Sequence, residues 1–176
     1  YSANGGNSWQ PAAFGTCCPG GVDLSSLTAS GTNVIATGSK STIIHSSDSG
    51  RNWTVPSVST SETKQLKAVK FVDNSTAIAI GEKIGTEFFL LRSTDGGGNW
   101  DFPTFPSGVG ENLNAFASKG SFVIAVGDNA TIISSDDSGA CLGPRSRADI
   151  SSLRHGRETG RTASGLRDQP REAEMR

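Results

Sequence analysis

The chain has 176 residues and a formal net charge of -1 at pH 7, with 16 basic and 17 acidic residues. This length can hold one domain with a stable core, and the balanced charge excludes nucleic acid and anionic membrane surfaces as partners attracted by total charge. The 22 glycines, with many Ser, Thr and Asn, indicate short strands joined by turns, and no apolar run is long enough to cross a bilayer.

Strands are expected in three successive groups. The first group comprises 24–29, 33–37, 42–46 and 52–55, the second 66–72, 76–80, 87–92 and 99–102, and the third 113–118, 121–126 and 131–135. Two of the second strands, at 77–80 and 122–126, are almost continuously apolar instead of alternating. Strands of this kind are buried on both faces, so we expect each group to form a sheet packed between neighbours.

A short motif, Ser-x-Asp-x-Gly-x-x-Trp, recurs where the third strand of each group ends. The two complete copies are Ser46, Asp48, Gly50 and Trp53, and Ser93, Asp95, Gly97 and Trp100. A weaker copy is Ser2, Asn4, Gly6 and Trp9, and a decayed copy is Ser135, Asp137, Gly139 and Leu142. The last positions of these four corner motifs, 9, 53, 100 and 142, are 44, 47 and 42 residues apart, close to the length of a four-stranded propeller blade.

Each residue type in the corner motif has a structural use. The Asp can accept hydrogen bonds from backbone N–H groups up to three residues further on, which replaces the ladder partners that a turn removes. The Gly permits the positive φ of a tight hairpin, and the Trp covers the hairpin with a large apolar surface. We therefore predict that Asp48, Asp95 and Asp137 hold the fold and take no part in catalysis.

The corner motifs resemble the Asp-box, also called the bacterial neuraminidase repeat, over residues 1–142. The resemblance implies an all-β fold: a partial β-propeller of about three four-stranded antiparallel blades plus the stub of a fourth. Residues 36–53 run from a small apolar residue through Gly, a short turn and an apolar pair into the motif. This order of residues is most similar to the blades of the photosystem II stability and assembly factor family. The longer turn at 81–86 departs from that pattern.

Similarity to the assembly factors implies a non-catalytic scaffold for a protein partner, such as a membrane-protein assembly intermediate. It also implies a location in the thylakoid lumen, the periplasm or the extracellular space. The turns between second and third strands form one face of a propeller, and Lys40, Lys83 and Asp128 occupy those turns. These three residues are the candidates for partner contact.

Sialidases and xyloglucan-cleaving glycosidases carry the same repeat, so the alternative is a fragment of such an enzyme whose catalytic residues lie outside this chain. A sialidase needs three arginines and a tyrosine nucleophile, whereas the repeats contain only Arg51 and Arg92 and the single tyrosine is Tyr1. Other glycosidases need two carboxylates facing each other across a cleft, and no such pair is recognisable. His45 and His155 suggest no metal site or catalytic pair. We expect no catalytic residue, cofactor or metal in this chain.

The end of the repeat and the number of blades lead to two further predictions. Residues 143–176 lose the apolar periodicity and are rich in arginine, which predicts a disordered tail after the propeller domain at 1–142. Three blades are fewer than the four to eight of closed propellers, and the chain begins at Tyr1 without a leader. We therefore expect either a fragment of a larger protein or association with further copies or partners that cover its open edge strands.

Overall fold

The computed structural model describes residues 1–13, 21–58, 60–105 and 110–144. The chain divides into two units, Tyr1–Arg145 and Ser146–Arg176. Apart from residues 143–144, the predicted tail lies outside the described residues. Within the described ranges, no helix is long and apolar enough to span a membrane.

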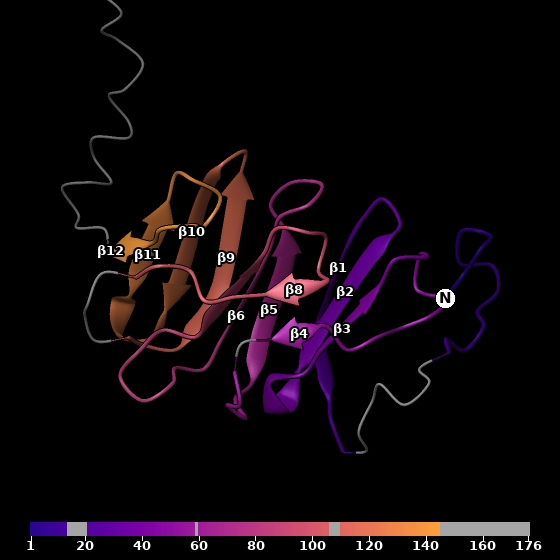
Figure 1. The fold of residues 1–176 in the computed structure, drawn as a ribbon, viewed down its shortest axis with the longest axis horizontal. Helices are drawn as coiled ribbons and strands as arrows, with labels where there is room; N and C mark the ends of the chain where they lie inside the picture. Colours follow the sequence, from indigo (N-terminus) through magenta and orange to yellow (C-terminus); the bar gives the residue numbers. More distant parts are fainter. Residues whose placement is uncertain (14–20, 59, 106–109, 145–176) are drawn as a thin grey trace, which may run out of the picture. The chain divides into compact units, whose positions relative to one another are not determined.

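The first unit is built from three antiparallel sheets that follow one another along the chain (Figure 1). The first sheet contains β1 (Leu24–Ser30), β2 (Asn33–Gly38) and β3 (Ile43–Ser46), the second contains β5 (Leu66–Phe71), β6 (Ala77–Gly81) and β7 (Leu90–Ser93), and the third contains β9 (Leu113–Lys119), β10 (Phe122–Gly127), β11 (Ile132–Ser135) and β12 (Gly143–Pro144). The two-residue strands β4 (Ser57–Val58) and β8 (Asn99–Trp100) pair in parallel. The short 3-10 helices η1 (Ser39–Ser41) and η2 (Asp128–Ala130) occupy the second turns of the first and third sheets.

The fourth strands are shorter than predicted. Only one bridge, between His45 and Thr54, joins residues 52–55 to the first sheet, and the second sheet repeats this arrangement. The predicted extent is wrong because the corner motif uses the backbone donors of this segment. The N–H group of Asn52, for example, bonds to the carboxylate of Asp48 and not to a neighbouring strand.

The core explains why the sheets stack face to face. Strand β6 is buried along its whole length, and its side chains alternate between two clusters. Ala79 packs with Ile35 of the first sheet, whereas Ile78 packs with Val123 of the third sheet. A strand points successive side chains to opposite faces, and burying one large aliphatic side chain contributes about 1.5–3 kcal/mol. The predicted burial of residues 77–80 on both faces is confirmed.

The third sheet differs from the second because one of its faces is uncovered within the described residues. In β10, Val123 and Ala125 are buried against the second sheet, but Val126 is 43% exposed. The predicted burial of residues 122–126 on both faces is therefore wrong. Strand β10 has the apolar side chains of a strand that is buried on both faces, but among the described residues only the second sheet covers it.

The first strands of the sheets lie side by side along a common inner edge. The backbone N–H of Val69 in β5 donates to Ser26 Oγ of β1 at 3.1 Å, and that of Phe71 donates to Thr28 Oγ1 at 3.2 Å. Strand β5 in turn contacts β9. Each sheet extends from this inner edge toward its own corner motif, so the three sheets radiate from the first strands.

A glycine ends the second strand of every sheet. These residues are Gly38, Gly81 and Gly127, and a Cβ atom on any of them would overlap the backbone carbonyl oxygen of the residue just before the first strand, namely Asp23, Gln65 or Asn112. Only glycine allows two backbone segments to approach so closely. The second turn of each sheet is thus held against the start of its first strand, and this end of the sheets carries the candidate site.

Candidate functional site

The first complete corner motif shows how its carboxylate is used. Asp48 Oδ1 accepts hydrogen bonds from Ser46 Oγ at 2.8 Å and from the backbone N–H groups of Arg51 at 3.0 Å and Asn52 at 2.9 Å. Asp48 Oδ2 accepts a bond from Asn52 Nδ2 at 2.6 Å. These bonds, foremost those from Asn52, hold the pKa of Asp48 well below its usual value. The carboxylate is ionised, and both of its oxygens serve the hairpin.

The other corner motifs repeat this pattern. Asp95 accepts equivalent bonds from its own motif. Partial burial opposes the ionisation of Asp95, but those bonds outweigh it and lower the pKa to about 2. In the N-terminal copy, Asn4 Oδ1 accepts the backbone N–H of Ser8 at 2.9 Å, so an amide oxygen takes the place of the carboxylate. The corner geometry therefore depends on an acceptor at this position and tolerates a neutral one.

Each of the three later corner motifs also pairs with the segment that follows the preceding motif. Three parallel pairings repeat this contact: Ala13 with Asn52, Ser57 with Asn99, and Thr104 with Cys141. The first partner lies four residues after the last position of one motif, and the second lies one residue before the last position of the next. The corners thus fasten neighbouring sheets together.

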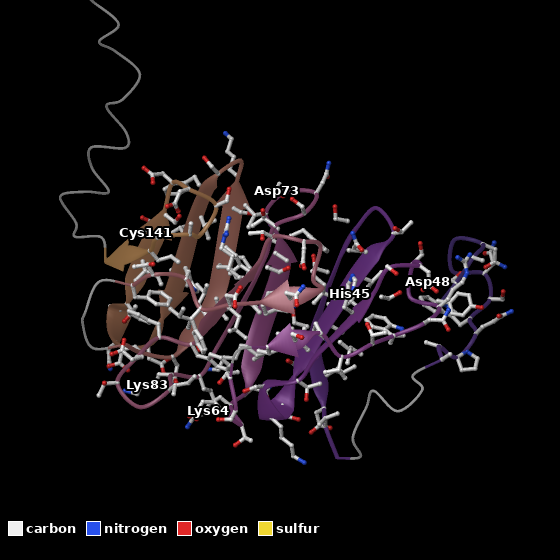
Figure 2. All side chains as sticks on the ribbon, viewed as in Figure 1. His45, Asp48, Lys64, Asp73, Lys83 and Cys141 are labelled. Atoms are coloured by element: carbon white, nitrogen blue, oxygen red, sulfur yellow. The ribbon has the colours of Figure 1, made fainter. Side chains whose placement is uncertain are left out.

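A cluster of polar side chains lies at the turn end of the second and third sheets, and we call it the turn-face network. Its members are Lys67, Lys83, Glu111, Asn112, Asn114, Asp128 and Asn129. Figure 2 shows Lys64 and Lys83 at this end of the strands and Asp73 at the opposite end. The network joins second-turn residues to residues at the start of β9.

Two of the three predicted partner-contact residues belong to this network. Lys83 Nζ lies 3.2 Å from Glu111 Oε2, and the backbone N–H of Lys83 donates to Asn112 Oδ1 at 2.9 Å. The other end of the Asn112 amide, Nδ2, donates to Asp128 Oδ2 at 2.7 Å. Asn112 therefore links Lys83 of the second sheet to Asp128 of the third.

Further amides fix the charged groups. Asn114 Nδ2 donates to Asp128 Oδ1 at 2.7 Å, and Lys67 Nζ donates to Asn114 Oδ1 at 2.7 Å. The bonds from Asn114 and then Asn112 lower the pKa of Asp128. Asp128 is therefore ionised at neutral pH and has a defined orientation.

Glu111 is held in the same way. Asn129 Nδ2 donates to Glu111 Oε1 at 3.0 Å, and this bond, followed by the bond from Lys83, lowers the pKa of Glu111. The side chain of Lys83 is 38% exposed and that of Glu111 is 19% exposed. The turn-face network thus presents ordered ionised groups that solvent and a partner can reach.

Lys40 lies outside the network, on η1 of the first sheet, where it is exposed and has a φ of 55°. Its turn is equivalent to those of Lys83 and Asp128, and within the turn its position matches that of Lys83 but not that of Asp128. Ser39, Glu82 and Asp128 share one position, because the backbone N–H of each donates to the carbonyl oxygen just before the first strand of its sheet. The repeat therefore aligns Lys40 with Lys83 and Asn129.

Glu111, Asn112 and Asn114 are not among the residues that the sequence singles out. They stand at the start of the third predicted first strand, beside a turn that a glycine anchors. This adjacency is a usable signal, because close approach at Gly127 brings the turn against the residues before β9.

Other titratable groups of the described residues lie outside the turn-face network. Within the described ranges, no group of three or more His, Cys, Asp and Glu residues could hold a metal ion. His45 Nε2 lies 3.1 Å from Asn33 Oδ1, and burial lowers the pKa of His45 although the charge of Asp95 opposes this. Cys141 is a free, exposed thiol. The arrangement is suited to binding through ordered surface groups.

Comparison with solved structures decides the fold. No protein-family model and no curated protein sequence matches the chain. Two structures of YCF48 do resemble it: YCF48 bound to D1 peptide, with a TM-score of 0.58 and 16% identity over 70% of this chain, and YCF48 from Cyanidioschyzon merolae, with 0.57 and 17% over 77%. An ancestral GH74 enzyme, also a β-propeller, has a TM-score of 0.54 and 15% identity over 74% of this chain. This chain is a segment of a β-propeller.

The propeller segment spans 40% and 42% of the two YCF48 chains and 19% of the GH74 enzyme. At these identities the likeness establishes the fold alone. The predicted all-β partial propeller is confirmed, with the three sheets as its blades. Residues 1–13 supply the corner of a preceding blade, because Asn4 and Ala13 make the same bonds as their counterparts in the later repeats.

Proposed function

We propose that this propeller segment is a non-catalytic scaffold that binds a protein segment on its turn face. The observation that carries the proposal is the turn-face network, in which amide side chains hold two carboxylates and the Lys67 ammonium group in place, and the Lys83 ammonium group pairs with Glu111. Because these groups are ordered before binding, less conformational entropy is lost on association. Charged groups in a fixed pattern also select a partner of complementary pattern.

The likeness to YCF48 supports a peptide as the partner. One of the YCF48 structures is a complex with D1 peptide, and YCF48 is a photosystem II assembly factor. By analogy, the partner of this segment would be an exposed stretch of a membrane protein during assembly. The corresponding location would be the thylakoid lumen, the periplasm or the extracellular space.

A glycoside hydrolase fragment is the second candidate, and the likeness to the GH74 enzyme favours it. A glycosidase needs a carboxylic acid whose pKa is raised so that it can donate a proton. In the turn-face network the shifts have the opposite sign, since hydrogen bonds lower the pKa of both Glu111 and Asp128. These residues therefore support the scaffold better, and hydrolysis of xyloglucan or of a fluorogenic sialoside by the full-length protein would favour the enzyme instead.

The binding proposal is tested with a fluorescently labelled D1 peptide and the whole chain, by anisotropy. Lys83→Ala removes the ammonium group that pairs with Glu111 while keeping the backbone bond to Asn112. We expect binding to weaken about tenfold, the equivalent of a hydrogen bond to a charged group. Lys119→Ala is the matched control, because Lys119 is an exposed lysine at the other end of β9. Equal affinities of the Lys83→Ala variant and the wild type, or equal losses in both variants, would refute the proposed site.

A further inference from the structure

The first sheet leaves an apolar face uncovered within the described residues. This rear face is the side of a sheet turned toward the preceding repeat. Leu24 is 46% exposed and Leu27 is 64% exposed, whereas the residues at the same repeat positions in the second sheet, Leu66 and Val69, are 0% and 5% exposed. The difference arises because the first sheet covers the rear face of the second and no described sheet covers the rear face of the first.

The third sheet leaves the opposite side uncovered. Its forward face, the side turned toward the following repeat, carries Ile124 and Val126. Val126 is 43% exposed and Ile124 is partly exposed, while their counterparts in the second sheet, Ile80 and Ile78, are fully buried. Both uncovered faces therefore have the composition of surfaces that are buried elsewhere in the same molecule.

A groove marks the uncovered rear face of the first sheet. It has a volume of about 500 Å³, and apolar side chains dominate its lining, including Trp9, Leu24, Leu27, Val34, Ile44 and Trp53. The corner glycine Gly50 borders this groove. An exposed apolar surface of this kind indicates a contact site.

We propose that a second copy of this chain docks in the groove, with the forward face of its third sheet against the rear face of the first sheet. The contacts between the first and second sheets and between the second and third sheets show how a forward face packs against a rear face. In each of them an isoleucine of the forward face lies against the corner glycine of the next sheet: Ile35 against Gly97, and Ile78 against Gly139. The same spacing places Ile124 of one copy against Gly50 of the other.

The contact is head to tail, because it joins different faces of the two copies. Each copy has one uncovered forward face and one uncovered rear face, so two copies can form two equivalent interfaces. Together they contain six described sheets, which falls within the range of four to eight blades in closed propellers. We therefore expect a dimer.

Residues 1–10 occupy part of the docking position. Tyr1 Cβ lies 3.9 Å from the place of a Cβ on Gly50, as His45 lies beside Gly97 at the same repeat position one sheet later. The incoming third sheet brings its own corner motif to this place, so the N-terminal corner has to move aside. Removing residues 1–10 is therefore expected to strengthen association, and weaker association of that truncated chain would contradict this placement.

Sedimentation velocity over a range of concentrations tests the dimer. We expect the wild type to dimerise, and Ile124→Asp and Leu27→Asp to weaken association at least about a hundredfold, because each would bury an unpaired charge. Val55→Asp is the control, since Val55 is 58% exposed but does not line the groove, and it should dimerise normally. Circular dichroism checks that each variant keeps its strands, and Val126→Asp replaces Ile124→Asp if that variant unfolds.

Mixing the two defective variants tests the head-to-tail geometry. The Leu27→Asp chain retains an intact forward face and the Ile124→Asp chain retains an intact rear face, so the mixture can form one complete interface. We expect a heterodimer in the mixture where neither variant dimerises alone. A wild type that stays monomeric at the highest soluble concentration, or a mixture that shows only monomers, would overturn the proposal.

Discussion

In the corner motifs, one side-chain oxygen accepts several hydrogen bonds that a neighbouring strand would otherwise accept. Asp48 and Asp95 each accept two backbone N–H groups and one hydroxyl on a single oxygen. Asn4 reproduces part of this pattern with an amide. The acceptor is therefore required for the hairpin, and the negative charge adds stability because charge-assisted bonds are the stronger ones.

Asp95→Asn separates the contribution of the charge from that of the acceptor. The pKa of Asp95 is about 2 in the folded chain, below the value of about 3.9 for an unfolded Asp. A carboxylate whose pKa is lower in the folded state than in the unfolded state stabilises the fold at pH values above the unfolded-state pKa. This stabilisation is lost as the pH falls toward the folded-state pKa. We expect the variant to lose about 1 kcal/mol of unfolding free energy at pH 7, because solvent screens the exposed carboxylate.

Urea unfolding from pH 7 to pH 2 measures this difference. The difference in unfolding free energy between the wild type and Asp95→Asn should decrease as the pH falls below about 4 and should nearly vanish around pH 2. Asp136→Asn serves as the control, since it removes the same charge from an exposed residue beside the third corner motif. A gap that is independent of pH would show that the charge is not the source of the stabilisation.

Turns and strands are tied together at the glycine that ends each second strand. At Gly81 an added Cβ would overlap the carbonyl oxygen of Gln65 and approach the Leu66 Cα at 3.0 Å. Both obstacles are backbone atoms, so neither can rotate away. The turn at 82–86 and the start of β5 would have to separate, and with them the anchor of the turn face.

We predict that Gly81→Ala lowers the unfolding free energy by about 3 kcal/mol, the upper range for overpacking a fixed site. The control is Gly143→Ala in β12, where nothing lies within 4 Å of the added Cβ and φ is not positive. Thermal or urea unfolding of both variants gives the comparison. A Gly81→Ala variant as stable as Gly143→Ala would show that the close approach is not maintained in solution.

Much of the element pattern follows from the repeat, and its exceptions have physical causes. The periodic spacing predicts the first three strands of each sheet, because the same hydrophobic runs recur between corner motifs. The third strand of the second sheet, however, begins at Leu90 and not at residue 87, where a bridge between Ile84 and Glu87 closes the longer turn. The fourth strands are overestimated, since apolar runs do not reveal that Asp48 takes the backbone donors of residues 51 and 52. Burial of β10 is overestimated because the burial of a strand depends on neighbours that its own residues do not specify.

Three sheets radiating from adjacent first strands produce one shared turn face, and this is a property of the whole segment. The sequence identifies Lys83 and Asp128 as turn residues, but it does not reveal that Asn112 connects them, because the connection crosses from one repeat to the next. A side-chain network between sheets depends on their stacking. Its members become visible only when the sheets are placed side by side.

Zero-length carbodiimide cross-linking of the native chain, read by mass spectrometry, tests this stacking most directly. The reagent joins an ammonium group to a carboxylate only when the two are in contact, and Lys83 Nζ lies 3.2 Å from Glu111 Oε2 across the second and third sheets. We predict a cross-linked peptide pair that joins Lys83 to Glu111 within one chain. A Lys83 that instead links to Asp73, at the opposite end of the strands, would contradict the stacked sheets and their shared turn face (Figure 2).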